Sequence, residues 1–375
     1  MKTTFLFYSR LDDRLACRRY RTAVSLHSHT FHSRESLSFI TAAMARAPWF
    51  GTAVRWQQAR YGVDMDLSRA WWTPPLSPTD AWRVEYNQIS RLLSMEPIVS
   101  LTDHDNIDAA STLTVIDRCR PHPISFEWTV PFRETFFHLG VHNLPPVRSR
   151  EIFSGMQRFT EAPSEPVFAD LLAYLNQHPE VLIVFNHPCW DEKGIGGARA
   201  AGLLQEFLAL YGSFVHALEL NGLRPWNENQ RVIDLAHSVG LPLISGGDRH
   251  GREPNANVNL TNAGSFSEFV EEVRCDRWSL PLFLPQYEET YWWRLFQVIC
   301  DVLRTDEEHG LGWTRWSDRV FYSREDGTVR SLTALFGDRP PLLVRHFVML
   351  AQLAGHRRMR EALRLAVARK QEVLS

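Results

Sequence analysis

The stretch Val24-Ser25-Leu26-His27-Ser28-His29-Thr30 begins as a β-branched and apolar run and ends in two histidines one residue apart. Successive side chains of a β-strand point to opposite faces, so positions i and i+2 share a face. The pattern therefore predicts that His27 and His29 project side by side. Two imidazoles on one face suit a divalent metal ion better than a hydrophobic core. We interpret this strand end as the start of a metal site that later segments complete.

The composition is that of an ordinary globular protein and excludes several function classes. The chain has 375 residues, of which 44% are hydrophobic and 22% charged, and its formal net charge is −2. This balance offers no global electrostatic attraction to nucleic acid or to a membrane surface. The chain also lacks an apolar run of the roughly 18 to 20 residues that span a bilayer. The five cysteines show no paired spacing, which argues against a disulfide framework or a cysteine-based zinc ribbon and favours a cytoplasmic location.

Strand-like and helix-like segments alternate through the middle of the chain. After the first strand, we expect strands over residues 98–101, 124–127, 136–141, 181–185, 215–220 and 241–245, with helical patterns between most of them. Repeated strand–helix–strand units imply a parallel sheet, and this many units suggest a barrel. We therefore expect an α/β fold with a metal-binding barrel over residues 1–255, interrupted by an insertion at 47–79. A mostly helical region, 256–375, would pack on the barrel.

Histidines or carboxylates stand at the end of almost every predicted strand. They are His27, His29, His104, Glu127, His138, His187, Asp248 and His250. Active sites of parallel barrels form where the carboxyl ends of the strands converge, so we expect these side chains to meet. Any one of them alone would more often be a cap, a rim salt bridge or a core histidine. Together they indicate a site for zinc, manganese or iron, in which a shared carboxylate can bridge two ions.

This ordered set of motifs resembles the PHP (polymerase and histidinol phosphatase) superfamily of metal-dependent phosphoesterases. The resemblance covers roughly residues 21–255, and it implies a distorted TIM-like barrel of seven strand–helix units that holds two or three divalent ions. It implies a first ion bound by His27, His29, Glu127 and Asp248. Glu127 would bridge to a second ion bound by His138 and His187, and a third ion would use His104 and His250.

The chain departs from the family pattern at two places. The family usually has an aspartate soon after the His-x-His motif, where this chain has Arg34 followed by Glu35. Either Glu35 reaches the third ion with its longer side chain, or His32 substitutes, or the third site is weak or empty. In the last motif, Gly247 and Arg249 stand where the family usually has serine and a small residue. The Arg249 guanidinium would either clamp a phosphate bidentately or form an outward salt bridge.

These observations favour a metal-dependent phosphoester hydrolase in which a metal-bound hydroxide attacks phosphorus in line. His104 or His250 would protonate the leaving oxygen, and Arg249, Arg224 and Arg252 are candidate phosphate contacts. The expected substrate is a small phosphomonoester, or a nucleotide or short oligonucleotide end. The insertion at 47–79 would restrict access by covering the mouth of the barrel.

Two other functions stay open on the sequence alone. The departures at Arg34, Gly247 and Arg249 would also suit a PHP-like module that has lost hydrolysis and serves as a binding or structural partner. Two or more bound ions per chain would favour the enzyme over such a module. Hydrolysis of a carbon–nitrogen or carboxylic ester bond is the weaker alternative, because related metal barrels often use a carboxylated lysine as the metal bridge. No lysine stands at a predicted strand end here.

Overall fold

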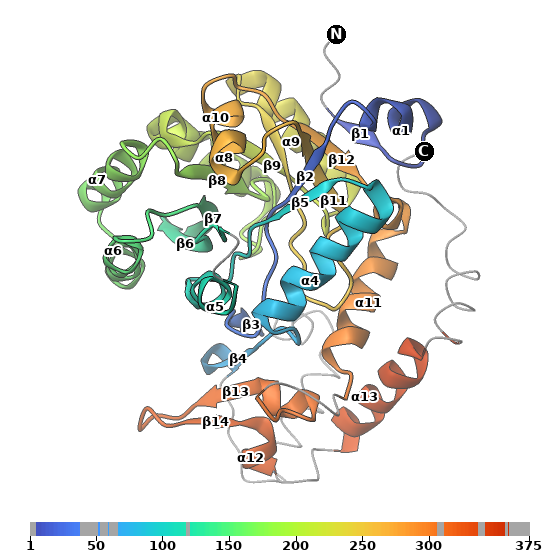
Figure 1. Cartoon of the computed structure of the whole chain (residues 1–375). Coiled ribbons are helices and arrows are strands. Elements are labelled where there is room, and N and C mark those ends of the chain that lie inside the picture. The colour runs from blue at the N-terminus through green and yellow to red at the C-terminus, as the bar shows by residue number, and fades with distance from the viewer. Residues whose placement is uncertain are drawn as a thin grey trace.

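The computed structural model describes residues 5–37, 67–117, 121–305, 311–336 and 342–356, together with the single positions 52, 59 and 359. These residues form a mixed α/β fold, as expected from the alternation of strand and helix patterns (Figure 1). Their strands are arranged in two five-stranded sheets and one four-stranded sheet. In the insertion predicted at 47–79, residues 47–66 lie outside the described residues except for positions 52 and 59, whereas residues 67–79 are described. Its predicted role in covering the mouth of the barrel therefore stays a prediction.

The first sheet contains the strand that leads to the two histidines. Its order is β1 (Leu6–Phe7), β12 (Leu280–Phe283), β11 (Asn257–Thr261), β2 (Thr22–Ser25) and β5 (Glu96–Val99). β2 and β5 run parallel, whereas β11 runs antiparallel to both of its neighbours. β11 and β12 lie beyond residue 255, so this sheet joins segments from both sides of the predicted domain boundary.

The second sheet supplies most of the other predicted strand ends. Its order is β10 (Leu243–Gly246), β9 (Ala217–Asn221), β8 (Leu182–Asn186), β7 (Thr135–His142) and β6 (Phe126–Phe132). β8, β9 and β10 run parallel, and β7 is antiparallel to β6 and β8. β8 is buried along its whole length, which explains its continuous apolar sequence. The sheet is therefore mixed, where the sequence had predicted a parallel one.

Helices cover these sheets and begin and end at recognisable residues. Those beside the sheets are α4 (Pro78–Gln88), α5 (Asp108–Ile116), α6 (Ser149–Glu161), α7 (Glu165–Asn176), α8 (Gly197–Tyr211), α9 (Trp226–Val239) and α10 (Phe266–Arg274). α4 starts after Ser77, whose hydroxyl accepts the Asp80 N–H at 3.1 Å. α9 ends at Gly240, whose φ of 69° lies in the left-handed region that favours glycine. Large aromatic side chains such as Trp128, Phe168 and Phe207 fill the core between the second sheet and its helices.

The third sheet lies at one end of the molecule and joins distant segments (Figure 1). Its antiparallel strands are β3 (Glu35–Ser36), β4 (Ala70–Trp72), β13 (Val320–Ser323) and β14 (Val329–Ser331). The C-terminal part of the chain also contributes α11 (Tyr291–Val302), α12 (Leu332–Phe336) and α13 (Leu342–Gly355). The region predicted to be mostly helical therefore contributes strands to two of the sheets.

The predicted distorted barrel is not closed by continuous strand pairing among the described residues. The first and second sheets are separate ladders that meet through isolated bridges, one between Ser28 and Arg249 and one between His104 and Glu127. Side chains replace part of the missing ladder: the Asn259 amide accepts the Ser245 N–H at 2.8 Å and donates to the Val24 carbonyl at 3.4 Å. Backbone hydrogen bonds also cross this seam just beyond the two strands, from the Gly247 N–H to the Leu26 carbonyl at 3.0 Å and from the Asp248 N–H to the His27 carbonyl at 2.7 Å.

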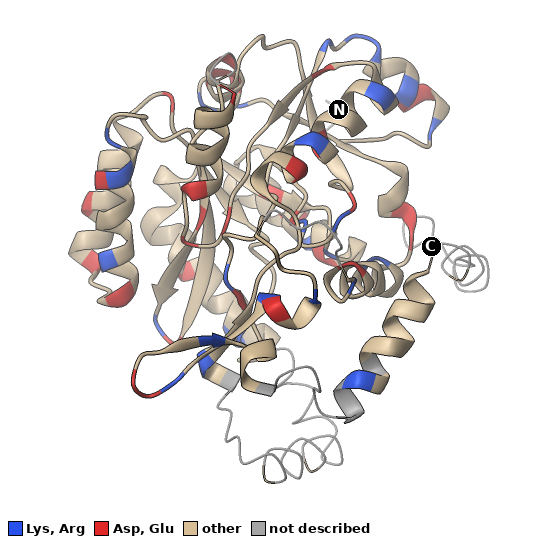
Figure 2. Ribbon diagram, turned by 60° about the horizontal axis from the view of Figure 1, so that its bottom comes forward, with Lys and Arg blue, Asp and Glu red and all other residues tan. Residues whose placement is uncertain are grey.

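Charged residues of both signs are interspersed along the outer elements (Figure 2). Among the helices of the described segments, none has the length and apolar character needed to cross a membrane.

Candidate metal centre

The histidines that follow β2 are brought together by a bend in the backbone. β2 ends at Ser25, and His27 has a φ of 61°, so strict strand alternation does not reach the histidines as the sequence analysis assumed. The two rings nevertheless lie with their centroids 5.1 Å apart. His187 and Asp248 also have positive φ values, 28° and 55°. Residues other than glycine rarely adopt this conformation, and such strain clusters at functional sites.

Glu127, near the start of β6, lies at the centre of the predicted ligands. Its Oε2 atom is 3.0 Å from His27 Nε2, 3.3 Å from His104 Nδ1 and 3.5 Å from His29 Nε2. Its Oε1 atom is 3.0 Å from His187 Nε2 and 3.5 Å from His138 Nδ1. The side chain is fully buried. Each carboxylate oxygen therefore faces its own set of imidazoles, which is the arrangement of a bridging ligand.

The first set of potential ligands combines His27, His29 and Glu127 with Asp248. Asp248 Oδ1 lies 3.6 Å from His27 Nε2 and 3.4 Å from His29 Nε2. His29 Nε2 is buried and has no hydrogen-bond partner among the described residues. Buried polar atoms without a partner are uncommon in folded proteins, and an ion coordinated by this nitrogen would satisfy it. The donor set of imidazole nitrogens and carboxylate oxygens fits a divalent zinc, manganese or iron ion.

A second set lies on the other side of Glu127. His138, on β7, and His187, at the end of β8, approach each other to 3.4 Å between Nδ1 and Nε2. Both nitrogens face Glu127 Oε1, so three ligand atoms surround one point.

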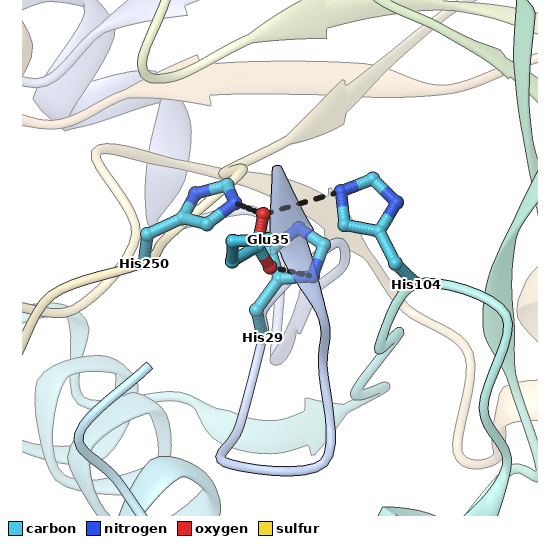
Figure 3. A group of neighbouring side chains, drawn as sticks. All are labelled: His29, Glu35, His104 and His250. Carbon is cyan, nitrogen blue, oxygen red and sulfur yellow. Dashed lines mark hydrogen bonds and ion pairs between the residues drawn. The ribbon is translucent and has the colours of Figure 1, made fainter. Parts of the chain in front are cut away.

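Glu35 brings together a third set (Figure 3). Its Oε2 atom lies 3.0 Å from His250 Nε2 and 3.6 Å from His104 Nε2, and its Oε1 atom lies 3.8 Å from His29 Nδ1. These four residues form one of the groups that could hold a metal ion. His32, the alternative to Glu35, packs its ring against Phe31. Of the two residues, Glu35 reaches the histidines that the sequence analysis assigned to a third ion.

The electrostatics of the cluster favour charged carboxylates. Burial raises the pKa of Glu127 and of Asp248, but the surrounding histidines outweigh burial and hold both pKa values well below their usual range. Burial lowers the pKa of His29 to about 3, so its ring is neutral and its nitrogens can coordinate metal. Burial also lowers the pKa of His250, but Glu35 and Asp248 outweigh that effect and raise it to about 9.

Several supporting residues belong to the strand-end motifs but were not among the predicted site residues. Glu219 Oε1 lies 2.5 Å from His27 Nδ1, and Glu219 Oε2 accepts the His187 N–H at 2.7 Å. One carboxylate thus orients His27 and the strand end that carries His187, a common role for a residue behind a metal ligand. Gly246 makes room for it, because a Cβ atom there would lie 1.7 Å from Glu219 Oε1. Glu219 follows the same strand-end pattern as the predicted ligands, and that pattern is the signal by which it could have been found.

Asn186 and Asp103 also support the site. Asn186 Nδ2 donates to Glu127 Oε1 at 3.0 Å. Asp103 accepts both the Thr30 N–H and the Thr30 hydroxyl, at 2.5 and 2.7 Å, and so holds the chain just after His29. Ser33 then donates to Glu35 Oε1 at 2.6 Å, which directs that carboxylate toward the cluster.

Two of the three arginines predicted to bind phosphate, Arg249 and Arg224, have guanidinium groups that donate to protein acceptors. Arg249 is buried, and its three guanidinium nitrogens donate to Glu85 Oε1 at 3.1 Å, to the Gly251 carbonyl at 2.8 Å and to the His29 carbonyl at 3.4 Å. Of the two roles considered for Arg249, the structure shows a salt bridge, but one directed inward to α4. Arg224 pairs with Glu228 at 2.9 Å. Arg252 lies beside α11, where its backbone N–H donates to Asp301 Oδ2 at 2.9 Å.

Comparisons with known proteins add structural neighbours of low similarity. No family model matches the sequence, and no curated protein matches it. One neighbour is described as a metal-dependent phosphoesterase from Bifidobacterium adolescentis, with 14% identity, a TM-score of 0.35, and coverage of 68% of this chain and 96% of that chain. PsfC from Pseudomonas syringae has 17% identity and a TM-score of 0.38, over 55% and 85% of the two chains.

An amidohydrolase from Chromobacterium violaceum has 15% identity and a TM-score of 0.35, over 65% and 92% of the two chains. At these TM-scores the likeness carries no argument about chemistry. The functional proposal therefore depends on the geometry of the residues around Glu127.

Proposed function

We propose that this chain is a metal-dependent hydrolase of the PHP type that acts on phosphoric ester bonds. The observation that carries the proposal is the position of Glu127, whose two buried carboxylate oxygens face separate sets of histidines. His29 Nε2 supports it, because this buried nitrogen lies 3.4 Å from Asp248 Oδ1 and 3.5 Å from Glu127 Oε2 without a hydrogen bond to either, and an ion among these atoms would satisfy it.

The chain offers donors for two ions and, with Glu35, for a third. The first ion would be held by His27, His29, Glu127 and Asp248, the second by His138, His187 and Glu127, and the third by Glu35, His104 and His250. When bound, manganese, zinc or iron ions neutralise charge on phosphoryl oxygens and lower the pKa of water. The observed donors are nitrogen and oxygen atoms, which are ligands that these metals accept.

His104 and His250 are the most accessible of the predicted ligands. Their side chains are 17% and 13% exposed, whereas the other members of the cluster are buried. A substrate would therefore approach from their side. His250 Nε2, hydrogen-bonded to Glu35 Oε2, or a nitrogen of His104 would hold the proton for the leaving oxygen where a third ion does not occupy them.

Because only His104 and His250 of the cluster are partly exposed, we expect a terminal phosphate to reach the site more easily than an ester in the middle of a long molecule. The proposed substrate is a small phosphomonoester, or a nucleotide or short oligonucleotide end.

The test is to purify the protein, measure bound manganese, iron and zinc, and assay phosphomonoesters, phosphodiesters and amides as one panel. We expect two or more ions per chain and hydrolysis of phosphate esters. Protein that stays free of metal and inert after manganese or zinc is added would overturn the proposal. Protein that binds the ions but hydrolyses nothing would support the alternative of a PHP-like binding or structural module.

A further inference from the structure

Glu192 lies beside the second set of ligands but outside every motif of the sequence analysis. We infer that its carboxylate is a direct ligand of the ion held by His138, His187 and Glu127. This inference rests on the proposed function. It assigns a chemical role to a loop residue five positions beyond His187, between β8 and α8.

Three side chains lie around His138 Nδ1 at distances that suit ligands of one ion. Glu192 Oε2 lies 3.7 Å from His138 Nδ1. The same nitrogen lies 3.4 Å from His187 Nε2 and 3.5 Å from Glu127 Oε1. Two ligands of one ion, each about 2.0–2.2 Å from the metal, stand roughly 3 to 4 Å from each other. Each of these three neighbours of His138 Nδ1 falls within that interval.

The loop that carries Glu192 is anchored at the residues on either side of it. Asp191 accepts the N–H groups of Ile195 and Gly196 through its two carboxylate oxygens, at 3.0 and 2.8 Å. Lys193 donates to the Glu134 carbonyl at 3.1 Å. These contacts hold both neighbours of Glu192 in place, and the Glu192 carboxylate lies 3.7 Å from His138 Nδ1.

Trp190 fixes the beginning of the same loop. Its ring packs against His187, with centroids 5.1 Å apart, and the Arg224 guanidinium carbon lies over the Trp190 ring, 4.2 Å from its centroid. The loop thus packs on the predicted ligand His187 through Trp190, and it is bonded through Asp191 to residues that follow Glu192. This packing helps to hold the loop in the position in which Glu192 lies beside His138.

The charges of the three sets support the same assignment. The first set has Asp248 in addition to Glu127, and the third set has Glu35. Without Glu192, the second set has two imidazoles and one carboxylate oxygen, Glu127 Oε1. The other oxygen of Glu127 faces the histidines of the other sets. A divalent ion there would lack a carboxylate of its own. Glu192 supplies one, so each of the three ions would have a carboxylate of its own, and the first two would also share Glu127.

The experiment compares metal binding by the wild type, Glu192→Gln and Glu192→Asp, with Glu161→Gln as a control. Glu161 is an exposed glutamate at the end of α6. Each metal-free protein is titrated with zinc against a competing chelator, and bound zinc is counted by elemental analysis. Glu192→Gln should weaken the second ion by at least the roughly 10- to 100-fold that loss of an outer partner costs. Glu192→Asp should bind more tightly than Glu192→Gln, and the control should match the wild type.

Cobalt absorption spectra separate a ligand from a residue that merely pairs with His138. A direct ligand changes the spectrum even when every site is saturated, so saturated Glu192→Gln should differ from the wild type. Identical saturated spectra, or unchanged zinc affinity, would overturn the inference while leaving the hydrolase proposal intact. A wild type that binds no ion would overturn both. Thermal melting of the metal-free proteins should coincide, which excludes misfolding as the cause of weaker binding.

Discussion

Glu127 and Glu35 contact the same group of histidines, but the fold holds them in very different ways. Glu127 belongs to a seven-residue strand that pairs with β7 along its length, and it is fully buried. Glu35 belongs to the two-residue strand β3, which pairs with Trp72 and Trp71 of β4. β4 in turn pairs with β13, nearly 250 residues further along the chain.

The difference shows that one part of the site is positioned by neighbouring strands and the other by segments that are distant in sequence. The position of Glu127 is determined by a local hairpin inside the second sheet. The position of Glu35 depends on the packing of the third sheet, which joins residues near both ends of the described chain. We therefore expect changes around Glu127 to affect every ion and changes around Glu35 to affect the third ion alone.

The largest effect should come from Glu127→Gln. The change removes the charge and one oxygen of the carboxylate that lies within 3.3 Å of His27, His104 and His187. We expect loss of bound metal and a fall in hydrolysis of at least roughly 10²- to 10³-fold, the loss that removal of one transition-state contact causes. Elemental analysis and phosphatase assays check this, and retention of all ions would contradict the bridging role.

Glu35→Gln should have a smaller and more selective effect. The change removes the carboxylate between His250 and His104 but leaves the contacts of Glu127 in place. We expect one ion fewer per chain and a loss of metal affinity at that site of about 10- to 100-fold. Zinc titration measures the affinity of each site. Equal weakening of all ions would show that the two parts of the site are not separable.

Binding at the third site should also depend on pH. Burial lowers the pKa of His250, but Glu35 and Asp248 outweigh it and raise it to about 9, so below that pH metal must displace a proton from the ring. Affinity of the third ion should rise with pH up to about 9 and then level off, by about tenfold per pH unit for one displaced proton. Isothermal titration at several pH values tests this. In Glu35→Gln the rise should end at a lower pH, because the main partner that raises the pKa is gone.

The smallest effect should come from Phe321→Ala on β13. The Phe321 ring stacks on Trp71, with centroids 5.8 Å apart, and contacts Trp313 at 5.7 Å. Loss of these aromatic contacts costs about 1 kcal/mol and loosens the strand that supports Glu35. We expect weaker binding of the third ion by a few-fold, with the first two unchanged.

Val329→Ala, on the exposed strand β14, serves as the control for Phe321→Ala. It should leave all three affinities unaltered. A uniform loss in both variants would point to general destabilisation of the third sheet, which thermal melting would reveal.

The sequence by itself determined where most strands lie and which side chains stand at their ends. Hydrophobic runs such as 181–185 and the polar residues that follow them are local features, so they can be read without knowledge of the fold. The structure brings together His27, His29, Glu35, His104, Glu127, His138, His187, Asp248 and His250. The ligand roles of these residues stay a prediction until metal is measured.

Tertiary structure alone decided how those side chains meet. Which oxygen of Glu127 faces which histidine depends on how the two sheets approach each other. The seam between them is bonded by the Asn259 amide together with a few backbone hydrogen bonds, such as that from the Asp248 N–H to the His27 carbonyl. Arg249 turned toward Glu85, a partner 164 residues away, and Glu192 reached His138 from a loop. No periodicity encodes such contacts, because they arise between segments that are distant in sequence and adjacent only after folding.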